Sequence, residues 1–210
     1  KSRSRGLGDV YKRQASWADD GGVNVKKMYA GATNLFESQP DLYVWAGRDF
    51  HQRPQTDLND YFWMMHDGQG AGFYNLNLGG AMLDFGAVAQ VEGDMVGDNG
   101  RYAITSKLHS IKLGESANLS LYANYGFASE KLDGEDVGDV KAYQVAGELS
   151  MSGQRVIVRY SDNAKDSVFD LADGQTATLV SFDGSTSLTD KAGIQYLSLI
   201  HISEPTRPRL

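Results

Sequence analysis

The amino-acid sequence predicts an all-β protein of antiparallel strands, and three observations carry this prediction. Apolar and polar residues alternate with a period of two from Val23 onward. Clusters of Gly, Asp, Asn and Ser interrupt the alternation about every 10–20 residues, as turns do. The composition is rich in Gly (24) and Tyr (11), with only 4 Pro and no Cys. This excludes a disulfide scaffold, a cysteine nucleophile and a Cys-type zinc site, and leaves a soluble β protein or a membrane barrel.

The first four candidate strands lie before residue 92. Alternation predicts strands over 25–32, 41–51 and 72–78. It is clearer over 83–91, where Leu83, Phe85 and Ala87 share one face and Asp84 and Gly86 the other.

Six further candidates follow. The strand 119–127 has the cleanest pattern, because every second residue from Leu119 to Phe127 is apolar. In 155–160, Val156 and Val158 alternate with Arg155 and Arg159. The other candidates cover 102–113, 143–151, 176–182 and 191–196.

The connections favour a transmembrane barrel over a soluble sandwich, although alternation alone leaves both open. Short turns at 113–118 and 151–154 alternate with longer polar connections at 92–101, 129–140 and 161–175, a pattern typical of membrane barrels. The strands run to about nine residues, longer than is usual in globular sheets. About 20 residues per strand and connection give nine or ten strands over 15–197. A wide aqueous pore needs about 16–18 strands, so this core corresponds to about half of a large barrel.

The two ends differ from the core in charge. Residues 1–14 carry five basic residues and one acid, and 198–210 add two arginines and two of the four prolines, whereas the whole chain has a net charge of −7. The strings GLGDVYKRQ and SLIHISEPTRP resemble translated sequencing-adapter DNA. We therefore expect both segments to be non-native and to lie outside the fold. A targeting peptide is the alternative for 1–14, but that segment lacks an apolar region.

The segment 45–80 carries the chemistry. A strand ends near His51, and the connection that follows is rich in Arg, Asp, Asn, Gln and aromatic residues. Planar polar groups hydrogen-bond sugar hydroxyls, and aromatic faces cover the apolar faces of a pyranose ring. A connection folded into a barrel lumen would place these groups in the path of a solute.

The string WAGRDFHQR…DYFW…GQGAGFYNLNLG resembles the maltoporin (LamB-type) carbohydrate porins of Gram-negative outer membranes. Their pattern has a WAG-(K/R)-R-F-Y-Q-R strand end, a D-F-Y-Y-W segment and a G-P-G-A-G turn. The resemblance covers most of 24–165, including KLHSIKLGESANLSLYANYGFA and RVIVRYSDNAKDS. It implies a partial antiparallel transmembrane β-barrel of about 9–10 strands out of 18. It also implies a homotrimer in outer-membrane lipid and an inward constriction loop near 52–70.

The resemblance assigns roles to three residues of this loop. Arg53 matches a constriction arginine and Asp60 a constriction acid. Phe62 matches a tyrosine opposite the line of aromatic residues that guides maltodextrins.

Four further positions match less closely. Lys26 matches a lumen arginine, and Trp17 matches, after a one-residue shift, an aromatic that reaches the neighbouring subunit. Gln55 replaces an expected acid and Asp57 an expected histidine, so the constriction has a rearranged charge pattern. This leaves the preferred sugar open.

The leading hypothesis is a channel for facilitated diffusion of maltodextrins or related oligosaccharides. A general or sucrose-type porin and a soluble carbohydrate-binding β-sandwich are the alternatives. No nucleophile motif is present, so we expect no enzyme, and we also expect no cofactor and no metal at His66 or His109. The acidic balance argues against nucleic-acid binding.

Several residues also have purely structural interpretations. Arg53 and Asp60 could form only a loop salt bridge, and Tyr43 and Trp45 are expected to pack rather than to bind ligand. Arg155 and Arg159 line either the lumen wall or a solvated surface.

Overall fold

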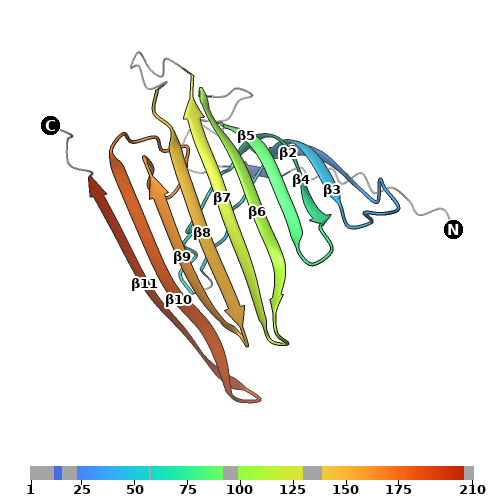
Figure 1. The fold of residues 1–210 in the computed structure, drawn as a ribbon, viewed down its shortest axis with the longest axis vertical. Coiled ribbons are helices and arrows are strands. Elements are labelled where there is room, and N and C mark those ends of the chain that lie inside the picture. Colours follow the sequence, from blue (N-terminus) through green and yellow to red (C-terminus); the bar gives the residue numbers. More distant parts are fainter. Residues whose placement is uncertain (1–11, 16–22, 57, 92–98, 130–138, 206–210) are drawn as a thin grey trace.

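The computed structural model describes residues 12–15, 23–56, 58–91, 99–129 and 139–205. Among these residues, eleven strands form one antiparallel sheet in which each strand pairs with its neighbour in sequence (Figure 1). The strands are β1 (Lys12–Ala15), β2 (Val23–Thr33), β3 (Tyr43–Asp49), β4 (Gly68–Asn77), β5 (Met82–Gln90), β6 (Arg101–Leu113), β7 (Ala117–Ala128), β8 (Ala142–Met151), β9 (Gln154–Asp162), β10 (Gln175–Thr189) and β11 (Ala192–Pro205). No helix within the described ranges has the length and apolar character needed to cross a bilayer.

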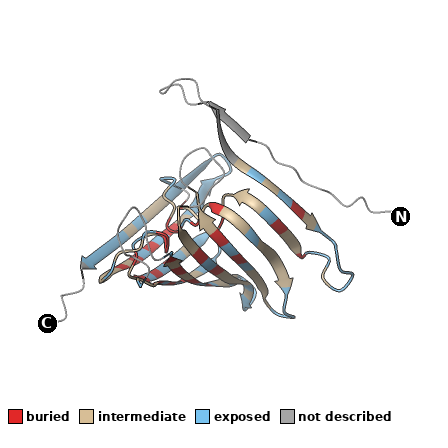
Figure 2. Ribbon diagram, turned by 90° about the horizontal axis from the view of Figure 1, so that it is seen from above, coloured by how far each residue is buried: buried red, intermediate tan, exposed pale blue. Residues whose placement is uncertain are grey.

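The sheet is twisted and curved into an open trough (Figures 1 and 2). Its edge strands are β1 and β11, which stand at opposite ends of the strand order. All ten predicted strands are present, as β2 to β11. The predicted partial barrel is therefore confirmed.

Short and long connections alternate along the sheet, as predicted. Residues 114–116 and 152–153 make tight turns, and Gly153 adopts a φ of 80° that favours glycine. The connections 50–67 and 163–174 lie at the opposite end of the strands. We call these two ends the short-turn end and the long-loop end.

The two faces of the sheet have inverted polarity. On β9, Arg159 is fully buried, whereas Val158 is 49% exposed. On β7, Asn124 is 4% exposed and Leu121 is 43% exposed. A soluble sandwich would bury the apolar face, whereas a transmembrane barrel turns an apolar band outward. The soluble sandwich is therefore excluded, and the polar face is the inner face.

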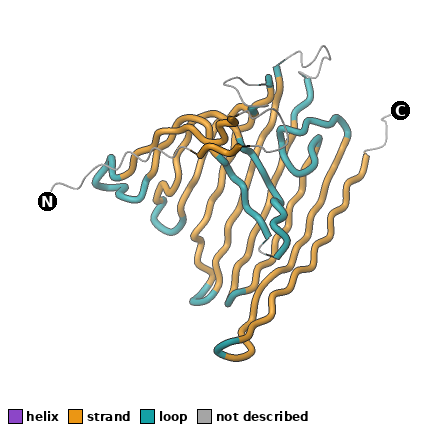
Figure 3. The backbone as a smooth tube through the Cα atoms, turned by 180° about the vertical axis from the view of Figure 1, so that it is seen from behind, coloured by secondary structure: helices purple, strands orange, loops and turns teal. Residues whose placement is uncertain are grey.

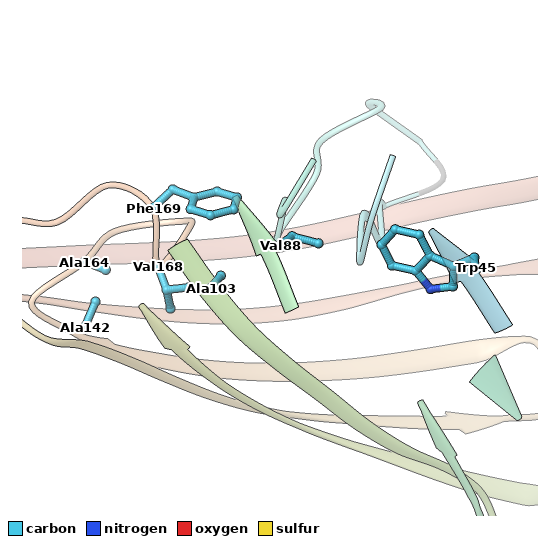
Figure 4. Packing of buried hydrophobic residues seen from close by; sticks show 7 residues of the cluster. All are labelled: Trp45, Val88, Ala103, Ala142, Ala164, Val168 and Phe169. Atoms are coloured by element: carbon cyan, nitrogen blue, oxygen red, sulfur yellow. The ribbon is translucent and has the colours of Figure 1, made fainter. Parts of the chain in front are cut away.

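Two long connections lie across the inner face and contribute residues to both buried clusters (Figure 3). The first buried cluster places Val168 and Phe169 of the connection 163–174 against the sheet (Figure 4). Its other members are Trp45, Val88, Ala103, Ala142 and Ala164. The second cluster packs Trp63 and Met64 of the connection 50–67 on Tyr122, Ala146, Ile157 and Leu179. The sheet is thus covered from inside by its own loops.

The ends of the described chain differ from expectation. We expected 1–14 and 198–210 to lie outside the fold, but residues 12–15 pair with β2. Residues 198–205 pair with β10, and alternating Ile200 and Ile202 extend the apolar outer face. Both β10 and β11 are longer than predicted because their polar residues near 184–193 still form the backbone ladder. The non-native origin of the end segments stays a prediction.

Candidate functional site

The connection 51–67 folds back on itself as a narrow hairpin-like loop on the inner face. The Thr56 amide donates to the Tyr61 carbonyl (2.9 Å), and the Trp63 amide donates to the Pro54 carbonyl (3.2 Å). A bridge between Gln55 and Phe62 lies between these bonds. The loop therefore presents side chains along two short antiparallel arms.

His51 anchors the base of the loop. Its Nε2 lies 2.6 Å from Thr105 Oγ1 on β6, and its Nδ1 lies 2.8 Å from the Tyr74 hydroxyl on β4. Gly86 leaves room for the ring, since a Cβ there would lie 2.8 Å from His51 Nε2. Burial lowers the pKa of His51 to about 4, which keeps the ring neutral at pH 7.

The middle of the loop is anchored by apolar packing. The Trp63 ring is fully buried and meets Tyr122 edge-on, with ring centres 5.3 Å apart. Met64 Sδ lies 3.1 Å from Asn124 Nδ2, also on β7. Phe62, the neighbour of Trp63, stays partly exposed on the other side of the loop. Of these two neighbouring aromatic residues, Trp63 therefore packs on the sheet, whereas Phe62 is available to a solute.

Two arginines of β9 tie the loop to the wall. Arg155 Nη2 donates to the Gln55 carbonyl at 3.0 Å, and its Nε donates to Asp183 on β10 at 3.0 Å. Arg159 Nη1 donates to the Trp63 carbonyl, and its Nη2 donates to Asp166 at 2.7 Å. Of the two interpretations left open by the sequence, the inner wall is therefore the correct one for both arginines, and both also fix the loop.

The connection 163–174 closes over the returning arm. The Tyr61 hydroxyl donates to Asp166 at 3.1 Å, and the Val168 amide lies 3.4 Å from His66 Nε2. A Cβ at Gly126 of β7 would lie 2.1 Å from the Val168 carbonyl oxygen, so only glycine permits this approach. Burial, with smaller effects from His51 and Arg159, lowers the pKa of His66 to about 3.

Arg53 is held in a fixed position. Its guanidinium carbon lies 4.4 Å from the Phe50 ring centre and 4.1 Å from that of Phe62. Its Nη1 forms an ion pair with Asp67 at 3.1 Å. Burial raises the pKa of Asp67 to about 6, although Arg53 opposes this shift. Cation–π contact and ion pairing together orient a planar donor group beside an aromatic face.

The alternative interpretation, a loop salt bridge between Arg53 and Asp60, is wrong, since Arg53 pairs with Asp67. Asp60 is exposed at the tip of the loop and accepts a long hydrogen bond from Gln55 Nε2 (3.4 Å). Its φ of 51° is typical of a tight turn.

The described contacts do not place the side chains of the three remaining predicted residues. Trp17 and Asp57 lie outside the described residues, and Lys26 is described only as backbone of β2. Its neighbour Lys27 pairs with Asp49 at 2.6 Å and lies 4.5 Å from the centre of the Phe50 ring.

Sequence reasoning missed several charged residues of the inner face, among them Asp67, Lys27 and Asp183. Asp183 continues the polar face of a predicted strand by one residue, so a longer strand would have revealed it. Asp67 follows the aromatic segment directly, but nothing local identifies it as the partner of Arg53.

The base of the loop, around Arg53, borders two cavities. One, of about 280 Å³, lies between Arg53 and the wall residues Tyr74, Lys107 and Tyr122. The other, of about 340 Å³, includes Phe50, Arg53 and Asp67. Arg53 therefore faces open space on both sides of the loop. Within the described ranges, no group of three His, Asp or Glu residues could hold a metal ion.

Comparison with known proteins agrees with this architecture. The family model described as LamB porin matches residues 6–206. A maltoporin of Vibrio cholerae serotype O1 (strain ATCC 39315) is 32% identical over 121 residues, which is 58% of this chain and 29% of that protein. A maltoporin of Photobacterium profundum is 33% identical over 125 residues, or 59% of this chain and 28% of that protein. The match thus spans less than a third of the length of these curated relatives. This chain belongs to the LamB porin family.

Proposed function

We propose that this chain forms part of the wall and the constriction of an outer-membrane channel for maltodextrins or related oligosaccharides. The observation that carries the proposal is the loop 51–67, which lies across a polar inner face while the outer face is apolar. Such a loop narrows a lumen and exposes its side chains to passing solutes. The relatives named maltoporin support a sugar as the solute.

Arg53, Phe62 and Asp60 are the proposed sugar contacts. The Arg53 guanidinium is oriented by Phe50, Phe62 and Asp67, so a hydroxyl pair can meet it without reordering the side chain. Phe62 offers a partly exposed ring to the apolar face of a pyranose. Asp60, at the exposed tip, supplies acceptors for hydroxyl donors.

The other predicted contacts are Gln55, Asp57, Lys26 and Trp17. The complete channel would be closed by further strands, embedded in outer-membrane lipid of a Gram-negative bacterium and assembled as a homotrimer. Transport is passive, so the proposal includes no enzymatic step, no cofactor and no nucleic acid.

The test is ion-current block in a planar bilayer by maltotriose, using the complete porin that contains this segment. Phe62→Ala should weaken the block about two- to tenfold, since a well-placed aromatic contact contributes about 0.5–1.5 kcal/mol. Phe182→Ala, on the outer face of β10, is the matched control and should leave the block unchanged. Unchanged current at millimolar sugar in the parental porin would contradict the proposal.

A differently selective porin is the second candidate. Gln55 stands where the family has an acid, and its amide engages Asp60 rather than leaving that carboxylate free. This rearrangement changes the pattern of acceptors that a sugar meets. Comparing block by sucrose, maltotriose and a neutral polymer of similar size separates the two. Stronger block by sucrose would favour this candidate, and equal passage of all three would indicate a general porin.

A further inference from the structure

A separate cavity of about 370 Å³ lies on the inner face beyond the tip of the loop. Among the described residues of the loop, Leu58 alone lines it, and the turn residues Ser116, Ser152 and Gly153 place it at the short-turn end. It therefore lies apart from the Arg53–Phe62 pair. Together with the Arg53 region, this cavity would give one lumen two separate groups of polar side chains.

The floor of the cavity is a row of polar side chains in register across four strands. Asn118 of β7 pairs with Ser150 of β8, Ser150 pairs with Arg155 of β9, and Arg155 pairs with Asp183 of β10. Directly opposed residues point to the same face of an antiparallel sheet. All four line the cavity. The row thus presents donors and acceptors side by side.

The charged members of the cavity are held rigidly. Arg155 binds Asp183 through two nitrogens, at 3.0 and 3.2 Å, and its Nη1 lies 3.7 Å from Glu148 Oε1. Glu148 Oε2 accepts a hydrogen bond from the Tyr122 hydroxyl at 2.9 Å. Asp183 is 3% exposed. Groups fixed in this way lose little conformational entropy when a ligand binds.

The charge balance restricts the ligand. Two carboxylates share one guanidinium, and each carboxylate retains acceptor sites beyond the bonds it makes. Such a surface repels anions and accepts hydroxyl donors, while Asn118, Ser185 and Gln195 add neutral polar groups on the same wall. A neutral, hydroxyl-rich unit fits this chemistry, whereas an acidic sugar does not.

We propose that this cavity is a second solute-contact site, which captures one or two neutral pyranose units at the short-turn end of the lumen. This inference rests on the proposed channel function. The site receives a sugar that enters from the short-turn side before the sugar reaches the loop. A sugar that enters from the long-loop side meets the loop first. The site therefore controls association from one side only.

The experiment measures current block by maltotriose added to one side of oriented, complete channels. Gln195→Leu and Asn118→Leu each remove an amide from the cavity while Arg155 and its loop contact stay intact. Association from the short-turn side should fall about fivefold, the value for one hydrogen bond of about 1 kcal/mol. Association from the long-loop side should not change. Gln69→Leu, the same kind of change on the outer face of β4, is the matched control and should affect neither side.

The outcomes separate the two proposals. Absence of block in the parental porin refutes the channel function itself. The second site is overturned if maltotriose blocks the parental porin and neither variant alters this block. It is also overturned if both variants alter the block equally from both sides. Trigalacturonate, an anionic trisaccharide, should associate from the short-turn side at a rate that the variants do not change. If the variants slow it as they slow maltotriose, the restriction to neutral sugars is wrong.

Discussion

Replacing Arg159 by methionine should release the loop 51–67 from the wall while leaving the sheet intact. Arg159 is fully buried and donates to the Trp63 carbonyl within the loop and to Asp166 in the connection 163–174. Its Nη2 also lies 3.5 Å from His201 Nε2 on β11. Methionine keeps much of the side-chain length but donates no hydrogen bond.

The free-energy cost of this substitution follows from the burial of each partner of Arg159. A buried carbonyl left without its donor costs about 1–3 kcal/mol. The ion pair adds about 0–1 kcal/mol, because the Asp166 side chain is 41% exposed. Removal of a buried cation also relieves its desolvation, which offsets part of the loss. We expect a net loss of about 2 kcal/mol, or about a 30-fold shift toward the released loop.

Hydrogen exchange of the chain in detergent micelles measures this shift. The reporter amides are those of Thr56, Trp63 and His66, which are bonded only within the loop. An undocked hairpin is marginally stable in water, so release exposes these amides. Their exchange should rise about 30-fold, while amides of β8 and β9 keep their rates. Lys112→Met, at an exposed position of β6, is the control.

Arg159→Lys should give an intermediate effect, since it keeps the charge but loses the planar fork. If exchange of the loop in Arg159→Met rises less than threefold, the arginine does not hold the loop. The apolar anchors, above all Trp63, would then carry the docking alone.

Three further outcomes are expected. Gly126→Val should displace the connection 163–174, because even a Cβ would lie 2.1 Å from the Val168 carbonyl oxygen; unaltered exchange of residues 163–174 would contradict this. Burial lowers the pKa of His51 to about 4 and that of His66 to about 3. The two neutral rings therefore contribute fully to the free energy of loop docking above about pH 6.5, and this contribution is lost as the pH falls through 4 and 3. Hydrogen-exchange protection of the loop amides, corrected for intrinsic exchange, that stays constant from pH 7 to 3 would refute this. Sequencing the gene across residues 14–15 and 197–198 should show a frame that runs on into a signal peptide on one side and into further alternating strands on the other, and present ends that prove genuine would contradict the fragment interpretation.

Alternation predicted the strands and the segregation of polar and apolar faces. It placed Arg155 and Arg159 opposite Val156 and Val158, and the structure has the arginines inside and the valines outside. Alternation could not tell which face is inside, because a soluble sandwich and a membrane barrel share the same period. Only the loops packed on the polar face distinguish the two.

The partners of the charged residues could not be predicted. A salt bridge between Arg53 and Asp60 was one interpretation of the sequence, but Arg53 pairs with Asp67 across the base of the loop. Arg155 meets a carbonyl 100 residues earlier in the chain. Such pairs depend on how far the sheet curves and where the loop falls across it, and neither is encoded in local spacing. The extent of β11 was missed because charge was used to judge the end of the chain, although its backbone pairs regardless of charge.

The contacts of the loop also determine the order in which this segment assembles. Tyr61 and Asp166 are 105 residues apart, and Trp63 and Arg159 are 96 apart. Bringing together residues so far apart in the chain costs conformational entropy, unless the hairpins between them have already formed. Strands β4 to β9 must therefore pair before the loop docks on the inner face. The loop emerges early in synthesis but docks late. Loss of the Arg155 and Arg159 side chains of β9 would therefore leave a paired sheet with an undocked loop.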